Sequence, residues 1–189
     1  MDNTDATPRG SILSLLSEKA VMKSKIYEQS LEVFNVLKEL LSEMSNDLNE
    51  MLDDKDYKRV RLEYRDRGKY EAELKFADDV LIFSMHTDVF QFDREHPVWQ
   101  NEYVKEDSNR TYCGVINVYN FLSDSMKFNR LDDMGYLVAR LFVNKDKAFF
   151  VEGKRQKKQM TDFFGKATLT KEDLVEFVES AILYTLSFD

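Results

Sequence analysis

Residues 11–52 carry apolar side chains at helical spacing and contain no proline or glycine. Positions three, four or seven apart form one apolar stripe: Ile26, Val33, Leu37, Leu40, Met44, Leu48 and Met51. This pattern predicts a long helix over residues 11–52. A straight helix of about 40 residues would be roughly 60 Å long, whereas a compact domain of this size is roughly 40 Å across. The helix therefore either breaks near residues 19–25, which we favour, or projects toward a partner chain.

A period of two replaces the helical period from Tyr57 onward. Apolar and charged residues alternate over 60–64 and again over 70–76, on either side of Gly68, and this alternation predicts a β-hairpin. A two-residue loop would mix the two faces, so we expect a three-residue loop with Gly68 in a left-handed conformation. The expected pairs are Tyr64 with Tyr70, Leu62 with Ala72 and Val60 with Leu74.

The rest of the chain alternates between strand-like and helical patterns. Residues 93–111 lack periodicity, and a loop of this length is usually either functional or disordered. The other expected elements, in chain order, are strands 80–86, 89–92 and 112–118, a short helix from Val118, a second hairpin of strands 136–144 and 148–152, and a helix from Thr170 to the C-terminus.

Consecutive hairpins with helices grouped around them predict an α+β fold. We expect an antiparallel sheet of five or six strands, with a long N-terminal helix, a short middle helix and a C-terminal helix. We assign residues 1–10 to a flexible terminus and 11–189 to one domain, with the sheet and the other helices over 57–187.

Composition narrows the class of protein. The chain has 189 residues, with 27 basic and 35 acidic side chains, and is 43% apolar and 33% charged. These values exclude a disordered tail and a membrane protein, and no apolar run approaches the roughly 20 residues of a membrane span. The acidic start has no signal-peptide pattern, and a single cysteine forms no internal disulfide. We therefore expect a cytoplasmic protein with no membrane partner.

Candidate catalytic chemistry is sparse. His86 and His96 match no metal motif, and Cys113 lies in an apolar strand as an inert thiol. No glycine-rich turn for a nucleotide phosphate joins a strand to a helix. We expect no metal and no cofactor. One enzyme alternative stays open, a metal-dependent nuclease using Asp133, Glu152 and Lys154, although the Glu-x-Lys spacing occurs at chance frequency.

Two groups of residues are candidates for binding. Trp99 and Tyr103 lie in the polar loop, where an aromatic ring either folds back on the core or meets a partner. Polar residues with apolar neighbours are candidates for a small-ligand site, the second alternative: Asn120, Asp124, Arg130 and Arg140.

Basic residues form two local clusters on an acidic chain. We expect the first hairpin to present a solvated face of ion pairs, because acidic residues share the face with the arginines. Nucleic acid is therefore not an expected partner. The residues concerned are Arg59, Arg61, Arg65 and Arg67 with Glu63, Glu71 and Glu73, and separately the stretch 154–158.

The stretch 112–188 has a recognisable order of boundaries. A helix ends in residues 127–130, Gly135 opens a strand, a hairpin turns at 144–147, and the last helix starts within 169–174. This order resembles the type III secretion chaperone fold, to which the YbjN-like bacterial regulator family is similar. The resemblance implies a non-enzymatic, often dimeric protein-binding module, and it carries over no catalytic residue. Together with the excess helix length, it leads us to predict a chaperone-like interaction protein that binds a protein partner and forms a homodimer.

Overall fold

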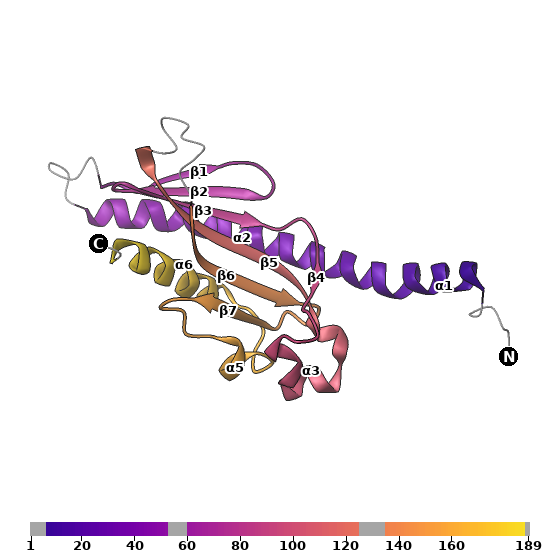
Figure 1. Cartoon of the computed structure of the whole chain (residues 1–189). Helices are drawn as coiled ribbons and strands as arrows, with labels where there is room; N and C mark the ends of the chain where they lie inside the picture. The colour runs from indigo at the N-terminus through magenta and orange to yellow at the C-terminus, as the bar shows by residue number, and fades with distance from the viewer. Residues whose placement is uncertain (1–6, 53–59, 125–134, 188–189) are drawn as a thin grey trace.

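The computed structural model describes residues 7–52, 60–124 and 135–187, and it confirms the predicted α+β class (Figure 1). The elements are α1 (Pro8–Ser14), η2 (Leu15–Ala20), α2 (Val21–Met51), β1 (Glu63–Asp66), β2 (Glu71–Phe76), β3 (Asp79–Met85), β4 (Phe90–Gln91), η3 (Pro97–Gln100), α3 (Glu102–Glu106), η4 (Ser108–Thr111), β5 (Tyr112–Leu122), β6 (Tyr136–Asn144), β7 (Phe149–Gly153), α5 (Met160–Phe163) and α6 (Lys171–Leu186).

The N-terminal helix runs without a break from Pro8 to Met51, so the break favoured near residues 19–25 is wrong. Pro8 occupies the first helical turn, and the side chain of Thr7 caps the turn by accepting a hydrogen bond from the Gly10 amide. A π-helical turn, η2, joins α1 to α2 while the backbone stays right-handed at both junctions. At 1.5 Å per residue the whole helix is about 66 Å long.

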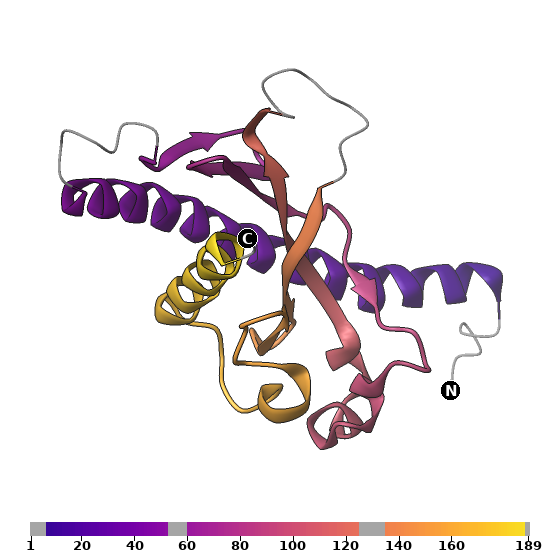
Figure 2. The same cartoon turned by 60° about the vertical axis from the view of Figure 1, so that its left-hand side comes forward.

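The sheet is antiparallel, in the order β1-β2-β3-β5-β6-β7. The short β4 pairs with the start of β5, so it continues the line of β3, as the sequence suggested for residues 89–92. In Figure 2 the strands cross α2 near its middle, and both ends of the helix extend past them.

The register of the first hairpin differs from the predicted one. Tyr64 pairs with Leu74 and Asp66 with Ala72, so the expected pairing of Tyr64 with Tyr70 is wrong. A shift by an even number of residues keeps every side chain on its own face, and alternation therefore cannot distinguish these registers. Lys38 of α2 favours the observed one, because its ammonium binds Asp66 at 2.8 Å and the Gly68 carbonyl at 2.9 Å.

The short middle helix begins later than predicted. Val118 lies within β5, which continues to Leu122 because it pairs with β3 along this length. Helical conformation starts at Ser123, and the rest of the predicted helix lies outside the described residues.

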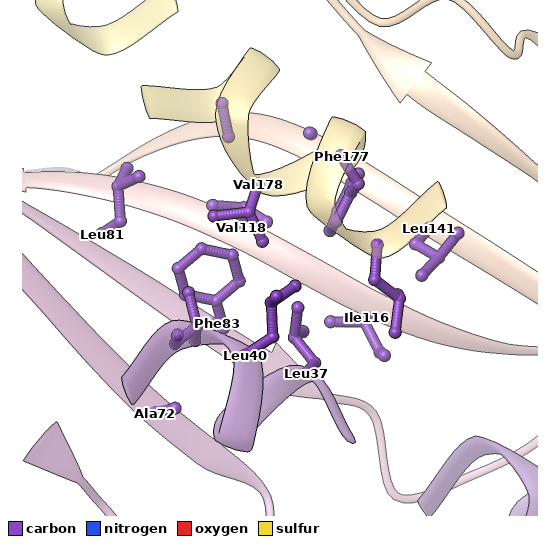
Figure 3. Close-up of a cluster of buried hydrophobic side chains, with 14 of the residues drawn as sticks. Leu37, Leu40, Ala72, Leu81, Phe83, Ile116, Val118, Leu141, Phe177 and Val178 are labelled. Carbon is purple, nitrogen blue, oxygen red and sulfur yellow. The ribbon is translucent and has the colours of Figure 1, made fainter. Parts of the chain in front are cut away.

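The main core lies between one face of the sheet and the two helices α2 and α6. In Figure 3, Leu37 and Leu40 of α2 and Phe177 and Val178 of α6 approach the side chains of the strands. The strands contribute residues from alternate positions, as a half-buried sheet requires. They include Ala72, Leu74, Leu81, Phe83, Ile116, Val118 and Leu141.

Residues 93–111 are ordered and cover one end of the opposite face of the sheet. The segment folds into η3, α3 and η4 and encloses a second apolar cluster. Four phenylalanine rings occupy its centre, with Phe142 stacked on Phe150 at 4.7 Å and Phe92 and Phe164 against Phe150. Of the two alternatives for this loop, disorder is therefore wrong.

The helix α2 approaches the sheet closely at Gly114 of β5. A Cβ atom at this position would lie 2.0 Å from Ser30 Oγ and 2.9 Å from Ser30 Cβ. Ser30 is buried, and its hydroxyl donates to the Ile26 carbonyl of the same helix. The absence of a side chain at Gly114 therefore sets how deeply α2 seats on the sheet.

Substitution of Gly114 tests this contact. We expect Gly114→Ala to lower the free energy of unfolding by about 1 to 3 kcal/mol, because α2 must move away from β5. Adding Ser30→Ala removes the closer atom and should recover part of the loss, whereas Ser24→Ala, on the exposed side of the helix, should recover none. Urea unfolding followed by circular dichroism measures all three. Unchanged stability of Gly114→Ala would contradict the close approach.

Candidate protein-binding groove

An apolar groove of about 660 Å³ opens at the end of the core where α2 and α6 both finish. Its walls come from three parts of the chain: the last turns of α2, the last turns of α6, and the base of the first two strands. The lining residues are Met44, Leu48, Met51, Leu52, Val60, Leu62, Phe76, Ala77, Glu179, Ile182, Leu183 and Leu186. Among these described lining residues, Glu179 is the only polar one.

Helical spacing aligns the groove residues on each helix. Met44, Leu48 and Met51 lie on the apolar stripe of α2 next to and beyond Ser45, the last buried residue of the helix. Leu183 and Leu186 lie on one face of α6 beside them. Met51 is 81% exposed, Leu183 54% and Leu186 52%. Contiguous apolar exposure of this kind marks interaction sites on monomeric proteins.

Asn49 of α2 fixes the hairpin wall of the groove. Its side-chain amide donates to the Leu62 carbonyl at 2.8 Å, and its side-chain oxygen accepts from the Leu62 amide at 2.9 Å. Leu62 precedes β1, so these two bonds hold the chain against α2 before the strand begins.

Ion pairs hold α6 in place on the other side. Lys158 donates to Asp173 at 2.5 Å and to Glu176 at 2.6 Å, and Lys171 of α6 pairs with Glu43 of α2 at 2.9 Å. Partial burial opposes ionisation of Asp173, but hydrogen bonds from Lys158 and Thr170 outweigh it and hold the pKa of Asp173 below its usual range. The start of α6 is thereby fixed to the segment that follows β7 and to α2, and the groove end of α6 is positioned with it.

The α2 wall of the groove is acidic outside its apolar stripe. Residues 39–51 include four acidic side chains and no basic one. Glu43 pairs with Lys171, whereas Asp47 and Glu50 have no ion-pair partner among the residues that the structure describes. Glu179 adds a further negative charge in the lining. The groove therefore suits an apolar segment that carries positive charge.

The two loop aromatics fold back on the protein. The Trp99 indole donates to the Asp93 carbonyl at 2.8 Å, and the Arg94 guanidinium lies 4.1 Å from its ring. The Tyr103 hydroxyl donates to Asp146 and accepts from Asn144, and burial raises the pKa of Tyr103 to about 12. Both residues pack against the second apolar cluster, far from the groove lining.

The candidate small-ligand residues do not come together. Asn120 is paired with Leu81, whose side chain lies in the main core, and its amide donates to Asp79 at 2.9 Å. Arg140 is paired with Glu152 across β6 and β7 on the other face of the sheet, with 3.7 Å between charged atoms. Asp124 is exposed, and Arg130 lies outside the described residues.

The nuclease candidates are also separated. Glu152 faces Arg140 on the sheet, whereas the Lys154 ammonium lies 5.9 Å from the Tyr184 ring of α6 on the opposite side. Asp133 lies outside the described residues. Within the described ranges, no three or more His, Cys, Asp or Glu side chains are grouped so that they could hold a metal ion.

The histidines and the cysteine have local structural contacts. His86 Nδ1 accepts from the Asp88 amide, and His96 caps η3 through the Val98 amide. Cys113 is fully buried, and burial raises the pKa of its thiol well above the usual range. On the first hairpin, Arg65 and Arg67 both pair with Glu73, and Arg65 also pairs with Glu63, so the predicted ion pairs are present. Glu73 is buried rather than solvated, and Arg59 lies outside the described residues.

A second, more polar hollow of about 510 Å³ lies on the other face of the sheet. Phe90, Phe92 and Phe142 line it together with His96 and the Arg140–Glu152 pair. Its one arginine pairs with Glu152 and its histidine is engaged as a helix cap, so that Asp93 and Glu95 have no matching cation in the described lining. The apolar groove is therefore the better candidate for a site.

Comparison with protein-family models, with curated proteins and with solved structures finds no match to the chain. The resemblance to type III secretion chaperones and YbjN-like regulators therefore stays a prediction. Within the described ranges, no helix combines the length and the apolar character needed to cross a bilayer.

The sequence pattern predicted that the groove residues of α2 lie on an apolar helix face, but it did not predict that they line a groove. Met44, Leu48 and Met51 fall on the predicted apolar stripe of α2, and a stripe alone does not show where the sheet beneath it ends. The signal that could have found them is the excess length of the helix over the domain. Leu183 is a large apolar residue that lies off the buried face of α6, and this offset is a second signal.

Replacing Asn49 tests how the groove wall is held. We expect Asn49→Ala to leave the Leu62 amide and carbonyl without partners and to lower the free energy of unfolding by about 1 to 3 kcal/mol. Asn46→Ala, an exposed position on the same helix, controls for the gain in helix propensity. Hydrogen exchange at the Leu62 amide should accelerate in Asn49→Ala alone. Equal exchange in both variants would show that Asn49 does not anchor the wall.

Proposed function

We propose that this chain is a non-enzymatic protein-interaction module that binds an apolar, positively charged helical segment of a protein in its groove. We further propose that it works in the cytoplasm as a dimer. The observation that carries the proposal is the groove itself, in which exposed Met51, Leu183 and Leu186 surround a cavity of about 660 Å³. Burying one such side chain fully stabilises a complex by about 1.5 to 3 kcal/mol before the costs of association.

The shape of the site favours a helix as the bound element. Two helix ends, α2 and α6, form its long walls, and an amphipathic helix laid between such walls packs through side chains at i, i+3 and i+4. Met44 and Met51 supply flexible, polarizable side chains that adapt to different apolar partners.

The acidic residues around the groove select the sign of the partner's charge. Asp47, Glu50 and Glu179 would attract lysine or arginine side chains that flank the apolar stripe of the bound helix. Complementary charge raises the association rate and disfavours acidic partners.

The remaining alternatives lack a comparable arrangement. Glu152 and Lys154 lie on opposite sides of the sheet, which does not favour the nuclease. Asn120 and Arg140 also lie on opposite faces, which does not favour a small-ligand site built from them.

A pair of short amphipathic peptides tests the groove. We expect a fluorescent peptide of leucine and lysine to bind, and a matched peptide of leucine and glutamate to bind roughly tenfold more weakly or worse. The double variant Leu183→Gln/Leu186→Gln should weaken binding of the lysine peptide by about tenfold or more. Fluorescence anisotropy measures each affinity.

Leu122→Gln is the matched control, because Leu122 is 62% exposed and lies at the end of β5, outside the groove lining. It should bind the lysine peptide as the unmodified chain does. If the groove variant also binds unchanged, or if both variants lose binding equally, the groove is not the binding site.

A further inference from the structure

We define the N-terminal arm as Pro8–Ala20, which comprises α1 and η2. It is a capped helix whose large apolar side chains are mostly exposed. Ile12 is 55% exposed, Leu13 67%, Leu15 59% and Leu16 58%. The stripe of α2 becomes buried only at Ile26, where the sheet begins to cover it. The arm therefore presents four leucine or isoleucine side chains within five positions to solvent.

The arm does not simply extend the buried stripe of α2. The π-helical turn η2 holds more residues per turn than an α-helix, so it rotates the arm's side chains relative to those of α2. Such turns occur frequently at functional sites. Ile12, Leu13 and Leu16 thus form a face of their own.

The charge of the arm and its base complements that of the groove. Residues 8–25 carry four basic side chains and one acidic one, whereas residues 39–51 carry four acidic side chains and no basic one. Lys23 already pairs with Asp88, but Arg9 and Lys25 have no ion-pair partner among the residues that the structure describes. Within the arm itself, Arg9 and Lys19 exceed Glu18 by one charge, and Lys23 and Lys25 add to it at the start of α2. The arm is thus an apolar helix with a small net positive charge, the class of segment that the groove suits.

The arm cannot reach the groove of its own chain. The arm is one end of a continuous helix of about 66 Å, and the groove lies at the other end (Figure 1). The α2 part of the groove, from Met44 to Met51, is about 10 Å long, which accommodates the roughly 6 Å from Ile12 to Leu16. Only a second molecule can bring the two together.

We propose that the groove of one copy of this chain binds the N-terminal arm of a second copy. The inference rests on the proposed function, since it names the partner of the same groove. Two copies related by a two-fold axis use both arms and both grooves and leave neither exposed, so assembly stops at a dimer. The lysine peptide then binds the unmodified chain by displacing the arm, and it binds the arm variant without this competition.

Two double variants separate the arm from the groove. Leu13→Gln/Leu16→Gln alters the arm and Leu183→Gln/Leu186→Gln alters the groove, and all four residues are more than half exposed. Glutamine is a good helix former, so circular dichroism should be unchanged. The full-length unmodified chain and Leu122→Gln should sediment as dimers at micromolar concentration. Each double variant alone should dissociate at least about tenfold more readily.

Mixing the two double variants is the decisive step. The arm variant keeps its groove and the groove variant keeps its arm, so the mixture should form a heterodimer through one intact contact. It should be weaker than the unmodified dimer, which has two contacts. The proposal is overturned if the unmodified chain is a monomer, if the groove variant still dimerises through paired arms, or if the mixture stays monomeric.

The lysine peptide distinguishes failure of this inference from failure of the proposed function. If the mixture stays monomeric but the arm variant binds the peptide, the groove takes a segment of another protein and the arm is not its occupant. If neither the second copy nor the peptide binds, both proposals fail.

Discussion

The long helix α2 can bury its apolar stripe only where the sheet lies beneath it. Gly114 lets the helix seat against β5 at Ser30, and burial of the stripe extends from Ile26 to Ser45. Beyond these limits the helix carries apolar side chains that the sheet does not bury, on a separate face in the arm and along the same stripe at the groove. The helix therefore has an uncovered apolar surface at each end, the arm at one end and the groove at the other. The proposed function follows from the difference in length between the helix and the sheet that covers it.

The basic and acidic residues of the helix are also divided between its two ends. The first part of the helix is basic and the last part acidic, so each end repels a copy of itself and attracts the opposite end of another molecule. The rest of the chain supports the groove end rigidly: Asn49 holds the hairpin, while Lys158 and Lys171 hold α6. A pre-formed site of this kind loses less conformational entropy on binding than a flexible one.

Much of the fold was predictable because alternation and helical spacing report directly on burial. The period of two around Gly68 identified the first hairpin, and the stripe from Ile26 to Met51 identified the helix. The register of Tyr64 was not predictable from alternation, since a contact with Lys38 of a distant element selects it. The groove was not predictable either, because Met44 and Met51 resemble core residues until the extent of the sheet is known.

Site-directed cross-linking tests the central claim most directly. Leu16→Cys in one population of chains and Leu183→Cys in another place one thiol on the arm and one in the groove, while the native Cys113 is fully buried. The account predicts that oxidation of the mixture yields a covalent dimer joining arm to groove, and that neither population alone yields as much. Equal cross-linking of Leu16→Cys with itself, or only monomers in the mixture, would contradict it.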